Sequence, residues 1–157
     1  MTRIGSSALY AILLVTLFAG LTACGTDDGG GGNATTTIRL AFPRSTATDI
    51  AFVEVTREVE GEAGAKRVLD LLVAGPADAE KTEHDVFNPF PVGTSVKSVT
   101  ISGGVATADL SSEILGFGGG SANVIAITGA IERTLLAQPG VTSVVILVEG
   151  EADAIQP

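Results

Sequence analysis

The clearest pattern in this chain lies in residues 96–110, VKSVTISGGVATADL. Its two consecutive glycines, Gly103 and Gly104, are the signature of a two-residue hairpin turn. Such a turn places Ser102 opposite Val105 and, further from the turn, Lys97 opposite Leu110. In this register one face is apolar and carries Val99, Ile101, Ala106, Ala108 and Leu110, whereas the other carries Ser98, Thr100, Ser102, Thr107 and Asp109. The separation predicts an antiparallel hairpin with one buried face.

A second hairpin is predicted upstream of the first. Apolar side chains at every second position between residues 36 and 42, ended by Pro43, indicate a strand with one buried face. The same alternation over residues 51–59 indicates its partner strand, with a loop through residues 45–49 between them. Arg57 has the parity of the valines in this second strand, so its side chain is expected to point toward the apolar face.

An amphipathic helix is predicted between the two hairpins. Residues 62–74 place apolar side chains at i, i+3, i+4 and i+7, and the pattern stops at Gly75-Pro76. Residues 76–91 are polar and rich in Pro, Asp and Asn, and we expect a surface loop with turns there.

Residues 121–138 favour a second helix, although several of their side chains are β-branched. Ser121 is the expected N-cap, and Pro139-Gly140 is the expected stop. A glycine inside a helix costs about 1 kcal/mol relative to alanine, so Gly129 is expected where another element packs closely.

The last predicted element is a strand. Residues 144–148 form a continuous apolar run that is too short for a helix, and we expect a strand that is central in the sheet and covered on both faces. The element order is then ββαββαβ. It predicts a single α+β domain with a mixed sheet of about five strands packed by two helices.

The first part of the chain has the pattern of a secretory leader. Arg3 is followed by an apolar stretch over residues 8–19 and then by Leu21-Thr22-Ala23-Cys24, which resembles a bacterial lipobox. The resemblance implies a lipoprotein signal peptide over residues 1–23, cleavage before Cys24 and acylation of its thiol. Residues 24–34 are then an acylated cysteine and a Gly/Asp-rich tether. We expect an extracytoplasmic protein with a lipid anchor in the cell membrane.

Composition excludes several classes of protein. The formal net charge of -9 repels phosphate backbones, so no nucleic-acid partner is expected. Cys24 is the only cysteine, so internal disulfides and zinc sites with several cysteines are excluded.

No catalytic, cofactor-binding or metal-binding residue is assigned. His84 is expected to be a solvated loop residue, and Glu80, Glu83 and Asp85 beside it lack the ligand spacing of a calcium loop. The loop 116–120 lacks the features of a nucleotide fingerprint, and we expect it to be a mobile loop that precedes a helix.

The remaining hydroxyl candidates for catalysis are Ser111, Ser112 and Thr94, and none has a histidine nearby in sequence. We therefore expect a protein that is not an enzyme.

Arg57 is the charged residue with the most informative position. Its parity leaves two alternatives open. It is either a structural arginine paired with a carboxylate at the edge of the core, or a contact for a ligand or partner.

Short motifs follow one another in order along residues 36–150. They are Val55-Thr56-Arg57-Glu58-Val59, the segment 68–76 ending in Ala-Gly-Pro, Pro91-Val92-Gly93-Thr94, the hairpin up to Ser111, Thr134-Leu135, and Pro139-Gly140-Val141 before the strand and Gly150. In order and spacing they resemble the GerMN domain of sporulation proteins, spore-germination proteins and Gram-positive envelope lipoproteins. One stretch departs from it, because residues 130–134 replace the Gln-Ile-Val-Tyr-Thr-like segment usual in that family, and no role of that Gln or Tyr carries over.

The resemblance implies a non-catalytic module that acts through protein contacts, over residues 35–150 and followed by a tail over residues 151–157. It also implies that self-association is an open alternative, because the GerMN fold is similar to ring-building motifs of sporulation assemblies. The expected partners are the membrane, through the lipid anchor, and envelope proteins or peptidoglycan. A cell-envelope enzyme accessory or a small-molecule sensor is the alternative function.

Overall fold

A computed structural model describes residues 34–156 of the chain. The predicted signal peptide, Cys24 and nearly all of the predicted tether lie outside the described residues. The described part belongs to one compact unit, Gly32–Pro157, and its buried core runs from Ile38 to Val148 along the sequence. Because this unit contributes its own core, it has what it needs to fold by itself. Within residues 34–156, no helix has the length and apolar character needed to cross a membrane.

The predicted first hairpin is confirmed. Strands β1 (Thr35–Ser45) and β2 (Ile50–Glu60) pair antiparallel over their whole length. One detail was wrong, since β1 continues through Pro43. The N–H of Ala41 points away from β2, and Pro43 has the same parity, so the N–H that proline lacks would not have bonded to β2.

The second hairpin, β3 (Val96–Ser102) and β4 (Val105–Leu110), is also confirmed, with the predicted register from Ser102–Val105 to Ser98–Asp109. The predicted pair of Lys97 with Leu110 was wrong, because a bulge at Lys97 places Val96 opposite Leu110. The bulge buries Val96 and leaves Lys97 exposed.

Three α-helices are described where two were predicted. They are α1 (Ala65–Val73), α2 (Asp78–His84) and α3 (Ser121–Leu136), and a short 3-10 helix, η1, spans Ser112–Gly116. Helix α2 lies in the segment predicted to be a loop. It buries none of its residues, so it has no apolar periodicity for the sequence to reveal. The N-cap of α3 is Gly120 rather than the predicted Ser121.

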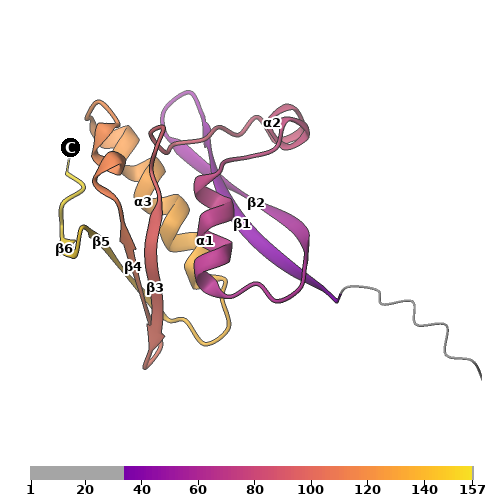
Figure 1. Cartoon of the computed structure of the whole chain (residues 1–157). Coiled ribbons are helices and arrows are strands. Elements are labelled where there is room, and N and C mark those ends of the chain that lie inside the picture. The colour runs from indigo at the N-terminus through magenta and orange to yellow at the C-terminus, as the bar shows by residue number, and fades with distance from the viewer. Residues whose placement is uncertain (1–33, 157) are drawn as a thin grey trace, which may run out of the picture. The chain divides into compact units, whose positions relative to one another are not determined.

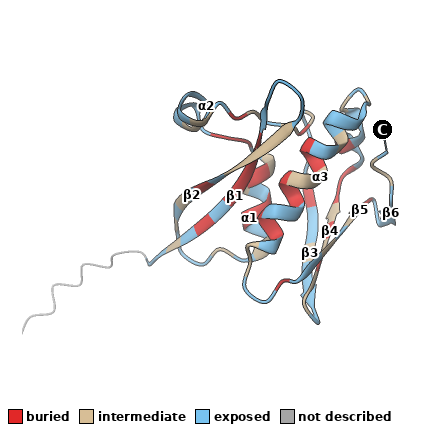
Figure 2. Cartoon of the chain, turned by 180° about the vertical axis from the view of Figure 1, so that it is seen from behind, coloured by how far each residue is buried: buried red, intermediate tan, exposed pale blue. Residues whose placement is uncertain are grey.

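The α+β class and the mixed sheet are confirmed. Strand β5 (Ser143–Val148) pairs parallel with β4 and antiparallel with β6 (Glu151–Ala152), giving the order β3-β4-β5-β6. The hairpin β1-β2 forms a separate two-stranded sheet instead of joining this one. Helices α1 and α3 contact both sheets, and Figures 1 and 2 show them between the hairpin and the four-stranded sheet. Side-chain periodicity predicts which face of a strand is buried, but it does not predict which other strand pairs with that strand in the sheet.

The prediction that strand β5 is covered on both faces was wrong. Val144 and Ile146 pack against the core on the face toward α3, whereas Val145 on the other face is 40% exposed. No described element covers that outer face, because both packed helices lie on the inner one.

Candidate functional site

Arg57 holds together three segments of the chain. Its Nε donates a hydrogen bond of 2.7 Å to Oε1 of Glu80, and its Nη2 donates one of 2.6 Å to Oε2 of Glu80 and one of 3.0 Å to the carbonyl of Gly75. The guanidinium also lies 5.5 Å from the centre of the Phe42 ring, a cation–π distance. The group therefore connects β2, the end of α1 and the start of α2.

The electrostatics of this cluster follow from its geometry. The side chains of Arg57 and Glu80 are 20% and 15% exposed, so the pair is only partly solvated. The Arg57 hydrogen bonds hold the pKa of Glu80 below its ordinary value, and the N–H of Ala77 contributes in the same direction. The carboxylate of Glu80 and one edge of the guanidinium are thereby occupied. A contact of Arg57 with a partner stays a prediction.

The acidic residues near His84 do not gather into a metal site. The Nε2 of His84 lies 4.0 Å from Oε1 of Glu83, and Glu80 is engaged by Arg57. Asp85 adopts a left-handed conformation that ends α2. Within residues 34–156 no group of three or more His, Cys, Asp or Glu side chains is arranged to hold a metal ion.

The hydroxyl of Ser111 has structural partners. It accepts a hydrogen bond of 3.0 Å from the N–H of Ser95, and its interaction with Glu113 lowers the pKa of that carboxyl. The hydroxyl of Thr94 is buried, and no described group bonds to it. Among the described hydrogen bonds, none joins Ser111 or Thr94 to His84.

The Gly-rich loop before α3 is held by one side chain. The Nδ2 of Asn123 donates to the carbonyls of Phe117 and Gly119 at 3.1 and 2.9 Å. The N–H groups of Asn123 and Val124 both donate to Gly120, within the first turn of the helix. These N–H groups are therefore already committed to helical hydrogen bonds.

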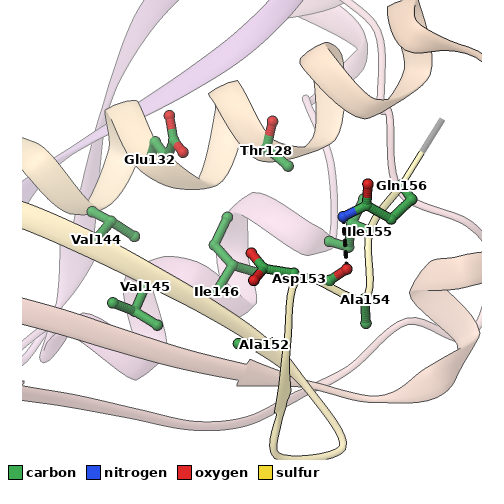
Figure 3. Close-up of a pocket in the computed structure, with 10 residues that line it drawn as sticks. All are labelled: Thr128, Glu132, Val144, Val145, Ile146, Ala152, Asp153, Ala154, Ile155 and Gln156. Carbon is green, nitrogen blue, oxygen red and sulfur yellow. Dashed lines mark hydrogen bonds between the residues drawn. The ribbon is translucent and has the colours of Figure 1, made fainter.

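The structure also contains a groove that sequence reasoning missed, with a volume of about 290 Å³. Figure 3 shows it between α3, the strand β5 and the C-terminal segment. We call it the β5 groove, and its lining residues are Thr128, Glu132, Val144, Val145, Ile146, Ala152, Asp153, Ala154, Ile155 and Gln156.

The tail forms one wall of the β5 groove. The side chain of Gln156 donates a hydrogen bond of 2.8 Å to the carbonyl of Asp153, drawn in Figure 3, and Ala154 and Ile155 pack against the core. The sequence signal was limited to the two apolar residues at positions 154 and 155, which are too few to predict an element.

Comparisons with known proteins identify the family and the fold of this chain. The family model described as Germane, sporulation and spore germination, matches residues 39–154. The chain belongs to this family. The predicted resemblance to the GerMN domain is confirmed.

Solved structures show the same fold as this Germane domain. The tandem GerMN domains of the sporulation protein GerM from Bacillus subtilis match with a TM-score of 0.63 and 20% identity, over 85% of this chain and 44% of that one. This chain thus spans less than half the length of the tandem structure. The first GerMN domain of the same protein matches with a TM-score of 0.52 and 20% identity, over 74% of this chain and 85% of that one. No curated protein matches the sequence.

Proposed function

We propose that this protein is an extracytoplasmic lipoprotein, anchored in the cell membrane through Cys24, whose Germane domain binds envelope proteins without catalysing a reaction. The observation that carries the proposal is that the domain lies shortly after an acylation pattern in the sequence. The family match over residues 39–154 follows closely after Leu21-Thr22-Ala23-Cys24, which has the pattern of an acylation site. Two or three acyl chains are enough for stable attachment, whereas one chain is marginal.

The contacts of the domain support a binding role. Two of the side chains considered for a site have structural partners, Glu80 with Arg57 and Ser111 with Ser95. The family description connects its members with sporulation and germination, and the proposal extends that connection to this chain. The alternative of an enzyme accessory or small-molecule sensor requires a pocket that gathers His84 with acidic side chains. His84 does not line the β5 groove, and no described contact favours that alternative.

The anchoring part is tested with the variant Cys24→Ser, expressed beside the unchanged chain in a bacterium that processes lipoproteins. We expect the unchanged protein to incorporate an alkyne-labelled fatty acid and to partition into the detergent phase. The variant is expected to lose both properties. Release of the unchanged protein without detergent, with an unmodified Cys24, would contradict the anchor.

The binding part is tested with residues 32–157 immobilised as bait for a solubilised envelope, beside sedimentation with isolated peptidoglycan. We expect a specific envelope protein to be retained and to be competed away by free domain. Pelleting with peptidoglycan alone would make the protein a wall-binding lipoprotein instead.

A further inference from the structure

The outer edge of β5 has backbone groups that no described strand uses. The N–H of Ser143 and of Glu149 donate to Gly104 and Leu110, so residues of odd number in this strand direct their backbone groups toward β4. Residues of even number direct theirs to the other edge. Val148 is paired there with Glu151 of β6, but in residues 34–156 no strand pairs with Val144 or Ile146 on that edge. Two N–H groups and two carbonyls are therefore open for an added strand.

This edge lacks the features that keep other edges in the domain from pairing. The outer edge of β1 contains Pro43 and is bonded at Ala41 by Thr134, and β3 has its bulge at Lys97. Strand β2 carries Glu54, Glu58 and Glu60. Charges, prolines and bulges of this kind prevent unwanted pairing at sheet edges. Residues 143–146, Ser-Val-Val-Ile, have none of them.

The β5 groove lies along this open edge and is acidic. It contains Glu132 of α3 and Asp153 of the tail, and no lysine or arginine lines it. Neither carboxylate forms an ion pair with another described residue. The larger apolar side chains of the lining are those of Val144, Val145, Ile146 and Ile155. A strand added here would bury alternate side chains beneath α3, close to Glu132.

We propose that the open edge of β5 binds an extended segment of another envelope protein by strand addition, and that this segment carries a lysine or arginine directed toward Glu132 and Asp153. The inference rests on the proposed binding function and names its surface and its ligand chemistry. Charge complementarity selects this occupant over a second copy of the chain. Pairing two β5 edges would bring two acidic grooves together, each on a chain with a formal net charge of -9.

The first test is a nuclear magnetic resonance titration of isotope-labelled residues 32–157. The probe is a capped peptide of alternating valine and threonine with one central lysine. We expect saturable shifts at the amides of Val144, Val145 and Ile146 and in α3 near Glu132. Methylating the peptide nitrogens that face β5 is expected to weaken binding by about tenfold or more, because it removes strand hydrogen bonds.

Charge variants test the acidic groove. Glu132→Gln and Asp153→Asn are each expected to lower the affinity for the lysine peptide by roughly two- to fivefold. The matched control Glu54→Gln, on an exposed residue of β2, is expected to leave the affinity unchanged. Absence of saturable shifts, shifts confined to other surfaces, or equal affinity for a peptide with glutamate in place of lysine would overturn the proposal. Dimerisation of the unit through β5 without peptide would also overturn it and assign the edge to a second copy.

A second test separates this inference from the proposed function. A photo-crosslinking amino acid is placed at Val145 or at Glu58 of the full-length anchored chain in cells. Crosslinks from Val145 to the envelope protein retained by the domain support the edge. The same protein crosslinked from Glu58 alone overturns the edge and leaves the binding function standing. If the domain retains no envelope protein and neither position gives a crosslink, both the binding function and the proposed edge are overturned.

Discussion

Thr134 on α3 closes the outer edge of β1. Its hydroxyl accepts a hydrogen bond of 2.9 Å from the N–H of Ala41, and these residues are 1% and 2% exposed. A buried N–H without an acceptor is costly, so a strand or a side chain must meet it. Here the helix supplies the acceptor, which explains how β1 remains stable at the edge of a two-stranded sheet.

Replacing Thr134 with valine tests this hydrogen bond. The substitution keeps the shape of the side chain but leaves the N–H of Ala41 without an acceptor. We expect a loss of about 1–3 kcal/mol in the free energy of unfolding, measured by urea denaturation of residues 32–157. Thr134→Ser keeps the hydroxyl, and its loss in the free energy of unfolding is expected to be smaller than that of the valine variant. Equal losses in the two variants would show that packing, not the hydrogen bond, matters at this position.

Gly129→Ala is expected to destabilise the domain, although alanine is the better helix former by about 1 kcal/mol. A Cβ at this position would lie 3.0 Å from Cε2 of Phe52 and closer still to Cζ, so the ring would have to move. The guanidinium of Arg133 also lies over this ring, 4.7 Å from its centre. We expect a loss of about 1–3 kcal/mol in thermal unfolding.

Phe52 supplies the control for that prediction. In a Phe52→Leu background, Gly129→Ala is expected to cost less than in the wild type, because the smaller side chain gives way. Identical costs in both backgrounds would place the strain elsewhere.

Arg57→Met is expected to lower the free energy of unfolding by about 1–3 kcal/mol, because it removes both arginine hydrogen bonds to Glu80 and the one to the carbonyl of Gly75. Arg57→Lys keeps the charge but not the bidentate geometry, so its loss in the free energy of unfolding is expected to be smaller than that of Arg57→Met. Binding to an envelope protein is measured in the same variants. Lost binding with unchanged stability would support the alternative in which Arg57 contacts a partner.

The Arg57–Glu80 pair also predicts a pH dependence. The pKa of Glu80 is lowered in the folded state, so its ionised form stabilises the domain at pH values above the ordinary value of 4.5. This contribution is lost as the pH falls from that value through the depressed pKa. We expect Glu80→Gln to flatten the acid side of the stability profile, measured by thermal unfolding against pH. Glu58→Gln, an exposed change on β2, is the control, and an equal flattening in both variants would contradict the assignment.

Asp85→Gly is expected to stabilise the domain by about 0.5–1 kcal/mol. Asp85 ends α2 with a φ of 55°, a conformation that glycine adopts without strain. Asp85→Ala is the matched change without that freedom, and it is expected to be neutral or destabilising. A glycine variant no more stable than the alanine variant would show that the aspartate meets no strain there.

Local patterns were sufficient for much of the fold. The Gly103-Gly104 turn fixes the β3-β4 register, and helical spacing identifies α1 and α3. The expectation that Gly129 marks a close approach is confirmed by Phe52. Helix α2 was missed because a short helix without a buried face has no periodic signal, and the bulge at Lys97 was missed because an alternating pattern does not show where an extra residue is accommodated.

Sequence patterns alone were enough for the alternating faces of β1 and β2, the β3-β4 turn, the two long helices and the acylation pattern around Cys24, because each depends on neighbours along the chain. The folded structure was needed to show that β1 and β2 form a separate sheet, that Arg57 contacts Glu80, and that the open edge of β5 lies beside Glu132 and Asp153. Each of these depends on which segments, distant in sequence, satisfy one another's backbone groups and charges. Periodicity carries no record of that choice.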